Sequence, residues 1–276
     1  MLNILTDSCA DLSQQLISAH QLEAIPLHVL INGKDYLDNQ LTLNDLFSSV
    51  ERTGELPMTA APSVNEFIEF FRREGPTIYV GLSSQLSATM QNAELAHKQL
   101  ENNQLIIIDS LNLSTGIGLL ALKAADLRDE GFSLEKIAKS LISIRSKVKT
   151  AFVIDTMDYL YKGGRCTALQ AVFGSMLKIR PIIHVREDGT LGVLEKVRGS
   201  RMKALDTLLR NFEKDLPDVD LTRVFVTHTG CDEDAAYLAE NIQKLAPVKQ
   251  VLITLAGATI ASHCGPDTIG ILYISK

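Results

Sequence analysis

The sequence predicts an α/β protein with two domains. An N-terminal domain over residues 1–150 is expected to contain a parallel sheet, and a C-terminal domain over residues 151–276 a mixed or antiparallel sheet. Three apolar strands in the first half each end in polar residues and precede a helical pattern, which is typical of a parallel sheet covered by helices. The second half mixes hairpin patterns with strand and helix crossovers. With 276 residues, of which 46% are hydrophobic, the chain can form two cores.

The chain begins with a strand and helix unit. Residues 3–6 form a short apolar strand that ends in Thr6-Asp7-Ser8, and a helix is expected to open near residue 11 and to run towards residue 20. Residues 25–31 alternate between apolar and polar side chains and predict one further strand. Asn32 and Gly33 then favour a hairpin turn, because both residue types tolerate the left-handed backbone that such turns require.

The next segment is predicted to contain two short helices joined by an extended loop. Thr42 is a candidate N-cap for a helix that reaches residue 50. Two prolines prevent residues 55–63 from forming a helix. Ser63 and Glu66 then have the spacing of a capping box, which predicts a helix as far as residue 73.

Two more apolar strands complete the first half. The segment 77–97 combines a buried strand, a hydroxyl-rich turn and a helix, and residues 105–108 form a strand that ends in Asp109 and Ser110. A helix rich in leucine and alanine follows Gly116 and Gly118. Residues 134–146 form an amphipathic helix, and residues 150–155 return as a strand. The boundary between the two domains is therefore expected near residues 147–156.

The second half begins with a glycine-flanked arginine, Arg165, and a helix predicted over about residues 167–177. Residues 182–185 and 191–197 are expected to form a hairpin, and a helix begins near Ser200. The remaining elements predicted are strands over 224–228, 250–255 and 269–274 and a helix over 232–245. This order favours a mixed sheet with helices.

Composition excludes several classes of function. The net charge of -6 and the pI of about 5.6 argue against nucleic acid as the main partner, which requires a concentrated basic surface. The first residues lack the pattern of a secretory signal and no apolar run is long enough to cross a bilayer, so we expect a cytoplasmic protein with no more than transient membrane-surface contact. Cys9, Cys166, Cys231 and Cys264 lack metal-ligand spacing, so free thiols are expected and no metal site.

A hydroxyl-rich turn is the strongest candidate for a binding site. Ser83, Ser84, Ser87 and Thr89 lie between a predicted strand and the following helix. In open parallel sheets this position holds ligands, because the strand ends leave a crevice and the next helix offers unpaired N–H groups. Such a turn suits a carboxylate or a phosphate. The alternative is that Ser83 or Ser84 simply caps the helix.

The sequence lacks the motifs that would indicate an enzyme acting alone. The run Gly81-Leu82-Ser83-Ser84-Gln85 lacks the second glycine of a nucleophile elbow, so a serine hydrolase is not favoured. The glycines at 116, 118, 163 and 164 match neither a dinucleotide fingerprint nor a P-loop, and we expect no cofactor and no intrinsic ATP site.

Two further residues are candidates for binding an anion, although each also has a common structural explanation. His263 is expected at the end of a short helix, followed by Gly265 and Pro266, which restrict the backbone and can aim the ring at an anion; alternatively, it is a core histidine with satisfied hydrogen bonds. Arg165 is either a solvated loop charge or, with Lys162 and its glycines, a feature that meets a phosphate or an acidic partner.

Taken together, these segments resemble the DegV family, the fatty-acid-binding subunits of bacterial fatty acid kinase. The likeness runs over essentially the whole chain and depends on the order and spacing of short motifs. The motifs are Thr6-Asp7-Ser8, Thr59-Ala60-Ala61-Pro62-Ser63, Ser83-Ser84-Gln85-Leu86-Ser87-Ala88-Thr89, Asp109-Ser110, Lys162-Gly163-Gly164-Arg165, Lys196-Val197-Arg198 and His263-Cys264-Gly265-Pro266. Against the family pattern, Ala60-Ala61 replaces Ser-Gln, Ala88 replaces Gly and Asp267 replaces Gly.

The resemblance implies a lipid-binding carrier that is not itself an enzyme. One long-chain fatty acid would be buried in a tunnel, with its carboxylate held by Thr59, Ser87 and His263. A separate ATP-dependent kinase would convert this carboxylate to an acyl phosphate, with Arg165 serving productive docking of the kinase. The resemblance places Ser84, Thr89 and Arg198 near the site.

The physical chemistry agrees with this assignment. A buried tail of about sixteen carbons at about 0.8 kcal/mol per methylene would supply most of the affinity, so the head group mainly needs hydrogen bonds. The helices that begin near residues 119 and 167 are candidates for tail-lining walls. Two alternatives remain at this point: an enzyme acting alone on a small carboxylate or phosphate, and a lipid sensor without a kinase.

Overall fold

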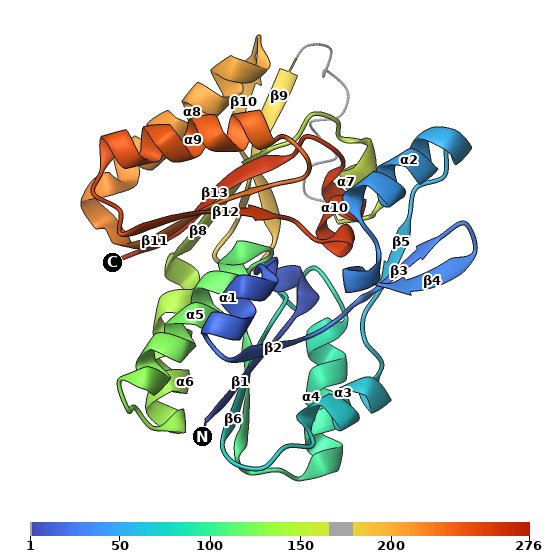
Figure 1. Ribbon diagram of the computed structural model, residues 1–276, viewed down its shortest axis with the longest axis vertical. Coiled ribbons are helices and arrows are strands. Elements are labelled where there is room, and N and C mark those ends of the chain that lie inside the picture. Colours follow the sequence, from blue (N-terminus) through green and yellow to red (C-terminus); the bar gives the residue numbers. More distant parts are fainter. Residues whose placement is uncertain (1, 166–178) are drawn as a thin grey trace.

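A computed structural model describes residues 2–165 and 179–276, and within them the chain forms three sheets with helices packed around them (Figure 1). A four-stranded parallel sheet occupies the N-terminal region and a six-stranded mixed sheet the C-terminal region. A small three-stranded antiparallel sheet lies to one side. The predicted α/β class, with a parallel sheet first and a mixed sheet second, is confirmed.

The N-terminal sheet has the strand order β2-β1-β6-β7, and all three pairings are parallel. Its strands are β1 (Asn3–Asp7), β2 (Leu22–Ile25), β6 (Thr77–Gly81) and β7 (Leu105–Asp109). Both faces are covered, since α5 (Thr115–Asp129) and α6 (Leu134–Ile144) pack on one face and α3 (Val64–Phe71) and α4 (Thr89–Leu100) on the other. This burial explains why the strands are apolar throughout.

The prediction of one strand over residues 25–31 was wrong. The chain leaves the parallel sheet at Ile25, and β3 (His28–Ile31) begins a different sheet. Pro26 lies at the break, because proline has no N–H to donate to a continuing ladder. The hairpin at Asn32 and Gly33 is confirmed, since both have positive φ, of 52° and 71°.

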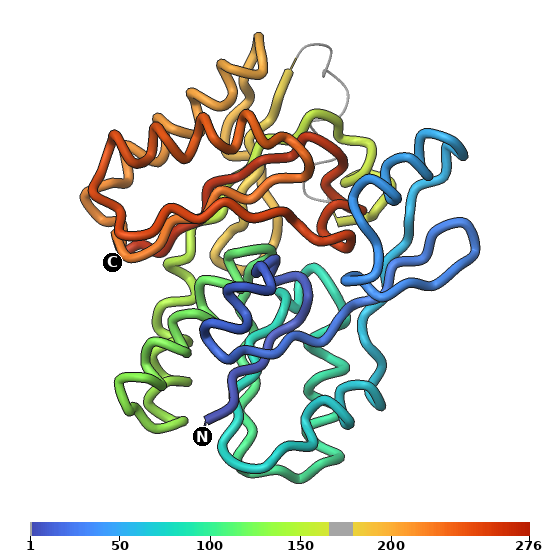
Figure 2. The backbone as a smooth tube through the Cα atoms, in the orientation of Figure 1, coloured from blue at the N-terminus to red at the C-terminus, as the bar shows by residue number. Residues whose placement is uncertain are grey.

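The three-stranded sheet has the order β4-β3-β5, with β4 at Lys34–Leu37 and β5 at Met58–Ala60. The sequence pattern identified residues 55–63 only as an extended loop. Pairing of β5 with β3 places Thr59 opposite Val29. Figure 2 shows this part of the chain projecting beside α10 (Ala258–Cys264), so residues near 30, 60 and 260 lie together.

Helix starts follow the predicted caps. Ser63 and Glu66 form both hydrogen bonds of the capping box at α3, and the Thr42 hydroxyl accepts a hydrogen bond from Asp45 N at the start of α2 (Leu43–Thr53). The first helix, α1 (Gln14–Ala19), is capped in the same way by Ser13. Short 3-10 helices span Ser8–Ala10, Asp38–Gln40, Arg145–Lys147 and Leu216–Asp218.

The C-terminal sheet has the order β10-β9-β8-β13-β11-β12, in which only β11 and β12 pair in parallel. Its strands are β8 (Val148–Val153), β9 (Ile179–Val185), β10 (Leu191–Arg198), β11 (Val219–His228), β12 (Gln250–Leu255) and β13 (Ile269–Ser275). Helices α8 (Arg201–Asp215) and α9 (Asp232–Leu245) cover one face. The predicted hairpin between β9 and β10 is confirmed.

Helix α5 lies between the two large sheets and joins their cores. Its buried residues Ile117 and Leu120 belong to the same hydrophobic cluster as Ile4 of β1 and Phe225 of β11. A bidentate ion pair from Arg223 to Asp126 adds a polar contact across the same interface. The loops at the ends of the parallel strands therefore face the C-terminal sheet.

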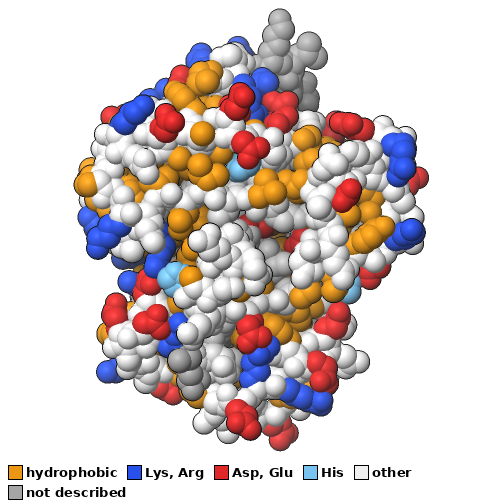
Figure 3. Space-filling view, viewed as in Figure 1, with side chains coloured by type: hydrophobic (Ala, Val, Ile, Leu, Met, Phe, Trp, Pro, Cys, Tyr) orange, Lys and Arg blue, Asp and Glu red, His pale blue; other side chains and the backbone are white. Residues whose placement is uncertain are grey.

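Two further features complete the description. The helix predicted over residues 167–177 lies outside the described residues, and α7 (Asp158–Lys162) precedes it. No helix in the described part of the chain is both long and apolar enough to cross a membrane. Acidic and basic side chains are interspersed on the face shown in Figure 3, which displays no concentrated basic surface.

Candidate functional site

An apolar cavity of about 190 Å³ lies where the turn after β6, strand β5 and helix α10 meet. Most of its wall consists of aliphatic and thiol side chains, about half of which are buried in the core. The lining residues of this kind are Cys9, Leu27, Ala60, Ala61, Leu82, Leu86, Ala88, Leu113, Leu160, Leu191, Ile260 and Cys264. Such a wall suits a hydrocarbon, because burial of apolar surface is favourable without specific polar contacts.

Four of the residues singled out in the sequence line this one cavity: Thr59, Ser87, Arg165 and His263. They come from four separate segments of the chain. Thr59 Oγ1 and His263 Nε2 are hydrogen-bonded at 2.7 Å, although the two residues are 204 positions apart. The cavity is therefore apolar along its wall and carries hydroxyl, imidazole and guanidinium groups together.

The hydroxyl-bearing residues of the turn between β6 and α4 have different structural roles. Ser87 Oγ lines the cavity side and is hydrogen-bonded to Thr89 Oγ1 at 2.8 Å, while Thr89 itself is buried outside the cavity. The Ser83 hydroxyl donates to the carbonyl of Gly189 at 3.0 Å, in the hairpin of the C-terminal sheet. Ser84 is exposed and lies outside the cavity.

The alternative role considered for Ser83 and Ser84, capping of α4, is not what the structure shows. Ala88 occupies the N-cap of α4, and the side chain hydrogen-bonded at the start of this helix is Ser87, whose Oγ accepts from Thr89 N at 3.2 Å. Ser83 instead connects the two halves of the molecule, a role that needs the C-terminal hairpin and has no local sequence signal.

Arg165 contacts the same turn from the loop after α7. Its Nη1 donates to the carbonyl of Gly163 at 2.6 Å, and its Nε donates to the carbonyl of Leu86 at 3.3 Å. Arg198, at the end of β10, is exposed and does not line the cavity. The structure thus brings Arg165 to the cavity and leaves Arg198 apart from it.

The imidazole of His263 is neutral at pH 7. Burial, together with the positive charge of Arg165, lowers the pKa of His263 to about 4. Its Nδ1 is buried and has no hydrogen-bond partner among the described residues. A neutral ring with Nε2 turned towards Thr59 can offer one N–H donor to an anion without carrying a charge.

Buried carboxylates hold helix α10 in place, and sequence reasoning missed them. Asp11 Oδ1 accepts a hydrogen bond from Gly257 N at 2.8 Å, and Asp38 Oδ1 accepts one from Thr259 N at 3.0 Å. Burial raises the pKa of Asp11 well above its usual range. Asp11 directly follows the 3-10 helix after β1, and Asp38 begins the 3-10 helix after β4, so the available signal was their position shortly after strands. They fix the helix that carries His263.

The Thr6-Asp7-Ser8 motif has a related role at the end of β1. Asp7 Oδ2 accepts hydrogen bonds from the Tyr79 hydroxyl at 2.9 Å and from Leu82 N at 2.8 Å. Burial raises the pKa of Asp7 to about 6. Asp7 therefore positions the chain just before the hydroxyl-rich turn.

A second, smaller cavity of about 30 Å³ adjoins the first and shares the walls formed by Leu113, Ile260 and Cys264. Its threonine hydroxyls are engaged within the protein; for example, Thr229 Oγ1 donates to the carbonyl of Gly265 at 2.8 Å. The second cavity thus extends the apolar space. The helix predicted near residue 119 as a wall of the tail site, α5, contributes no lining residue to either cavity, and the helix predicted near residue 167 lies outside the described residues.

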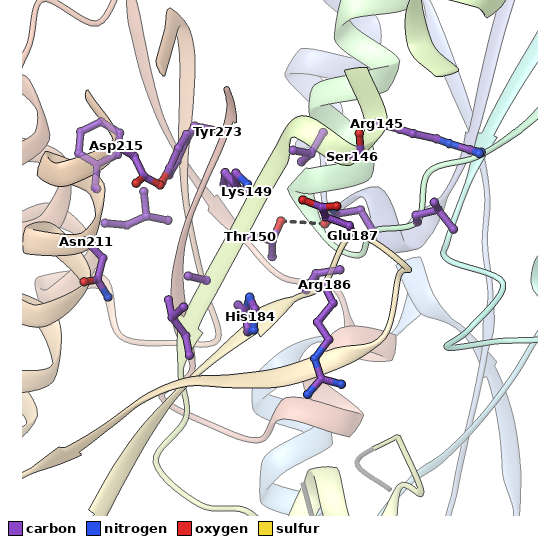
Figure 4. Close-up of a pocket in the computed structure, with 18 of the residues that line it drawn as sticks. Arg145, Ser146, Lys149, Thr150, His184, Arg186, Glu187, Asn211, Asp215 and Tyr273 are labelled. Carbon is purple, nitrogen blue, oxygen red and sulfur yellow. Dashed lines mark hydrogen bonds between the residues drawn. The ribbon is translucent and has the colours of Figure 1, made fainter. Parts of the chain in front are cut away.

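A larger and more polar cleft of about 560 Å³ lies elsewhere, between α8 and the end of the β9–β10 hairpin (Figure 4). Figure 4 shows Lys149, His184 and Arg186 spread along the cleft, and Asp215 beside Tyr273 at its other end. None of the predicted head-group residues lines this cleft. In the described part of the chain, no group of three potential metal-binding side chains occurs.

Comparison with known proteins decides the family. A family model described as "Uncharacterised protein, DegV family" matches residues 1–276. The chain belongs to the DegV family. A DegV domain-containing protein of Caldanaerobacter subterraneus subsp. tengcongensis is 31% identical over 99% of this chain and 98% of its own length.

Solved DegV structures share the whole fold. The structure of a fatty-acid-binding DegV family protein from Thermus thermophilus is 30% identical, covers 100% of this chain and 99% of its own, and has a TM-score of 0.94. The Streptococcus pneumoniae fatty acid kinase (Fak) B3 protein, loaded with linoleic acid, is 23% identical with a TM-score of 0.87 and covers 100% of both chains. That second likeness shows the common fold.

Proposed function

We propose that this DegV protein binds one long-chain fatty acid, with the tail in the apolar cavity and the carboxylate at Thr59, Ser87 and His263. The observation that carries the proposal is the 2.7 Å contact between Thr59 Oγ1 and His263 Nε2 at a cavity whose wall is mainly aliphatic. The fatty acid binding of the Thermus thermophilus relative supports the same ligand class.

The energetics assign different tasks to the tail and the head group. Burial of about fourteen methylenes at about 0.8 kcal/mol each corresponds to roughly 11 kcal/mol before the costs of association. A carboxylate taken out of water loses its hydration and needs hydrogen-bond donors. Two hydroxyls and a neutral imidazole supply these donors, and they hold the carboxylate less tightly than a bidentate arginine would.

Native mass spectrometry and palmitate titration test the binding step. The protein purified from cells should carry a fatty acid, and the delipidated protein should take up palmitate. Thr59→Val keeps the shape but removes the hydroxyl, so a loss of about 1.5 to 3 kcal/mol, roughly ten- to 150-fold in affinity, is expected. Ser84→Ala is the matched control, because Ser84 is exposed and lies outside the cavity. A protein that is empty and ignores palmitate would contradict the proposal.

We infer further that a separate ATP-dependent kinase acts on the bound acid in the cytoplasm, where ATP is available. A carboxylate oxygen would attack the γ-phosphorus of ATP; the new carboxyl O–P bond forms, the bond to the β,γ-bridging oxygen breaks, and ADP leaves. The family resemblance supports this step, and so does the position of Arg165 at the cavity, where it can be reached by a partner while it contacts the turn that carries Ser87.

The kinase step is tested with Arg165→Ala. At saturating palmitate, acyl phosphate formation with an acyl kinase and ATP should fall by at least tenfold. Lys162→Ala is the control for loss of charge in the same loop, because Lys162 is exposed and does not line the cavity. Unchanged phosphorylation in Arg165→Ala would remove Arg165 from the kinase step. Palmitate binding without acyl phosphate would indicate a lipid sensor.

A further inference from the structure

A glycine directly follows each of the helices α7 and α10, and an aromatic ring of the other helix packs against each glycine. A Cβ atom at Gly163 would lie 2.5 Å from His263 Nδ1 of α10. A Cβ atom at Gly265 would lie 2.7 Å from the Tyr159 ring of α7. The contact is therefore reciprocal, and both glycines are needed for the rings to approach so closely.

Position 163 requires glycine because there is no room for a Cβ atom, and not because of its backbone conformation. Gly163 has φ -69° and ψ -11°, which any residue adopts, so the backbone dihedral angles suit alanine, but its Cβ would also lie 2.8 Å from the carbonyl oxygen of Tyr159. Gly265 differs, because its φ of 79° itself favours glycine. Gly164, the next residue along the loop, has a positive φ of 71° but has open space at its Cβ position. The two neighbouring glycines thus have different requirements, which allows a matched experiment.

Gly163 also contacts the arginine that we place at the kinase step. Its carbonyl accepts the 2.6 Å hydrogen bond from Arg165 Nη1, while its α-carbon faces His263 Nδ1. On the far side of the ring, His263 Nε2 is hydrogen-bonded to Thr59. One line of contacts therefore runs from Arg165 through Gly163 and His263 to Thr59.

We propose that Gly163 is a positioning residue that couples the loop of Arg165 to the head-group histidine. With the loop seated, the Gly163 backbone presses on the Nδ1 edge of the ring and keeps Nε2 at Thr59. When a partner engages Arg165, the bond to the Gly163 carbonyl opens, the loop retracts from the ring and His263 becomes free to turn. The partner's docking would then loosen the hold on the carboxylate at the moment of transfer. This inference rests on the proposed function and describes its regulation.

The test compares Gly163→Ala with Gly164→Asn. Asparagine tolerates the positive φ at 164, and its side chain meets open space, so palmitate affinity should stay within twofold of wild type. Gly163→Ala should weaken palmitate binding at least tenfold and shift the 15N resonances of His263, because the added methyl displaces the ring from Thr59. In a His263→Ala background, Gly163→Ala should cause no further loss, since the two changes act through the same ring. Additive losses would overturn the proposal.

Arg165→Lys tests the coupling without adding volume. Lysine keeps the positive charge beside His263 but lacks the fork that reaches both the Gly163 and Leu86 carbonyls. The His263 resonances should shift or broaden as the loop loosens, while circular dichroism and the melting temperature report whether each variant is folded. Unchanged His263 resonances in both folded variants would overturn the coupling. If wild type binds no fatty acid, the proposed function fails, and the resonances still decide whether Gly163 positions the ring.

Discussion

Acidification should destabilise the folded protein through His263. The ring has a pKa of about 4 in the folded state, because it is buried and lies near Arg165. An unfolded histidine has a pKa of about 6.5. Between these values the unfolded chain binds more protons than the folded one, so stability falls as the pH falls from 6.5 towards 4 and the loss levels off below 4.

The magnitude follows from the two pKa values. Between pH 7 and pH 4.5 the single site costs about 2 kcal/mol of unfolding free energy by proton linkage. This is a large share of the roughly 5 to 15 kcal/mol that stabilises a typical domain. Since His263 is largely buried, solvent screening reduces the effect little.

Urea denaturation across this pH range measures the effect as a difference between wild type and His263→Gln. Glutamine keeps a hydrogen-bonding group for Thr59 but does not titrate. The stability difference between the two proteins should shrink by about 2 kcal/mol from pH 7 to pH 4.5, and an NMR titration should place the His263 pKa near 4. Parallel stability curves, or a His263 pKa near 6.5, would refute the reasoning.

Three other substitutions have defined outcomes. Ser83→Ala leaves the Gly189 carbonyl without the partner it has at 3.0 Å, so a loss of about 1 to 3 kcal/mol in urea denaturation is expected, and a neutral result would contradict a joining role. Phe67→Ala empties a fully buried position and should cost about 3 to 5 kcal/mol; a loss below about 1 kcal/mol would contradict the packing. Asp7 has a pKa raised to about 6, so ionising it destabilises the fold as the pH rises from 4 to 7; relative to Asp7→Asn, wild type should lose about 2 kcal/mol over this range, and an unchanged difference would contradict the buried state of Asp7.

Local signals in the sequence predicted most of the elements. The capping box at Ser63 and Glu66 and the turn at Asn32 and Gly33 depend on side chains within a few positions, so the chain itself contains the information. The break at Pro26 was misassigned, because an alternating pattern continues while the chain passes from one sheet to another. Periodicity reports which face of a strand is buried and does not report which sheet the strand joins.

The candidate site divides in the same way. Thr59, Ser87, Arg165 and His263 were selected from motifs, and the structure places all four at one cavity. Hydrogen bonds between segments that are far apart in the sequence have no motif from which they could be predicted. Examples are the bond from Ser83 to Gly189 and the carboxylates of Asp11 and Asp38 that hold α10.

The sequence by itself determined the residue types, the order of strands and helices and the family resemblance, because these depend on side-chain chemistry and short spacings. Only the tertiary structure decided what the hydroxyl-rich turn does. Packing of α5 between the two sheets brings this turn against the C-terminal hairpin, where Ser83 is used to join the halves and Ser87 is left at the cavity. The 2.7 Å hydrogen bond between Thr59 and His263 joins residues that are 204 positions apart in the sequence. No local sequence signal relates residues so far apart, and only the packing of the folded chain brings them into contact.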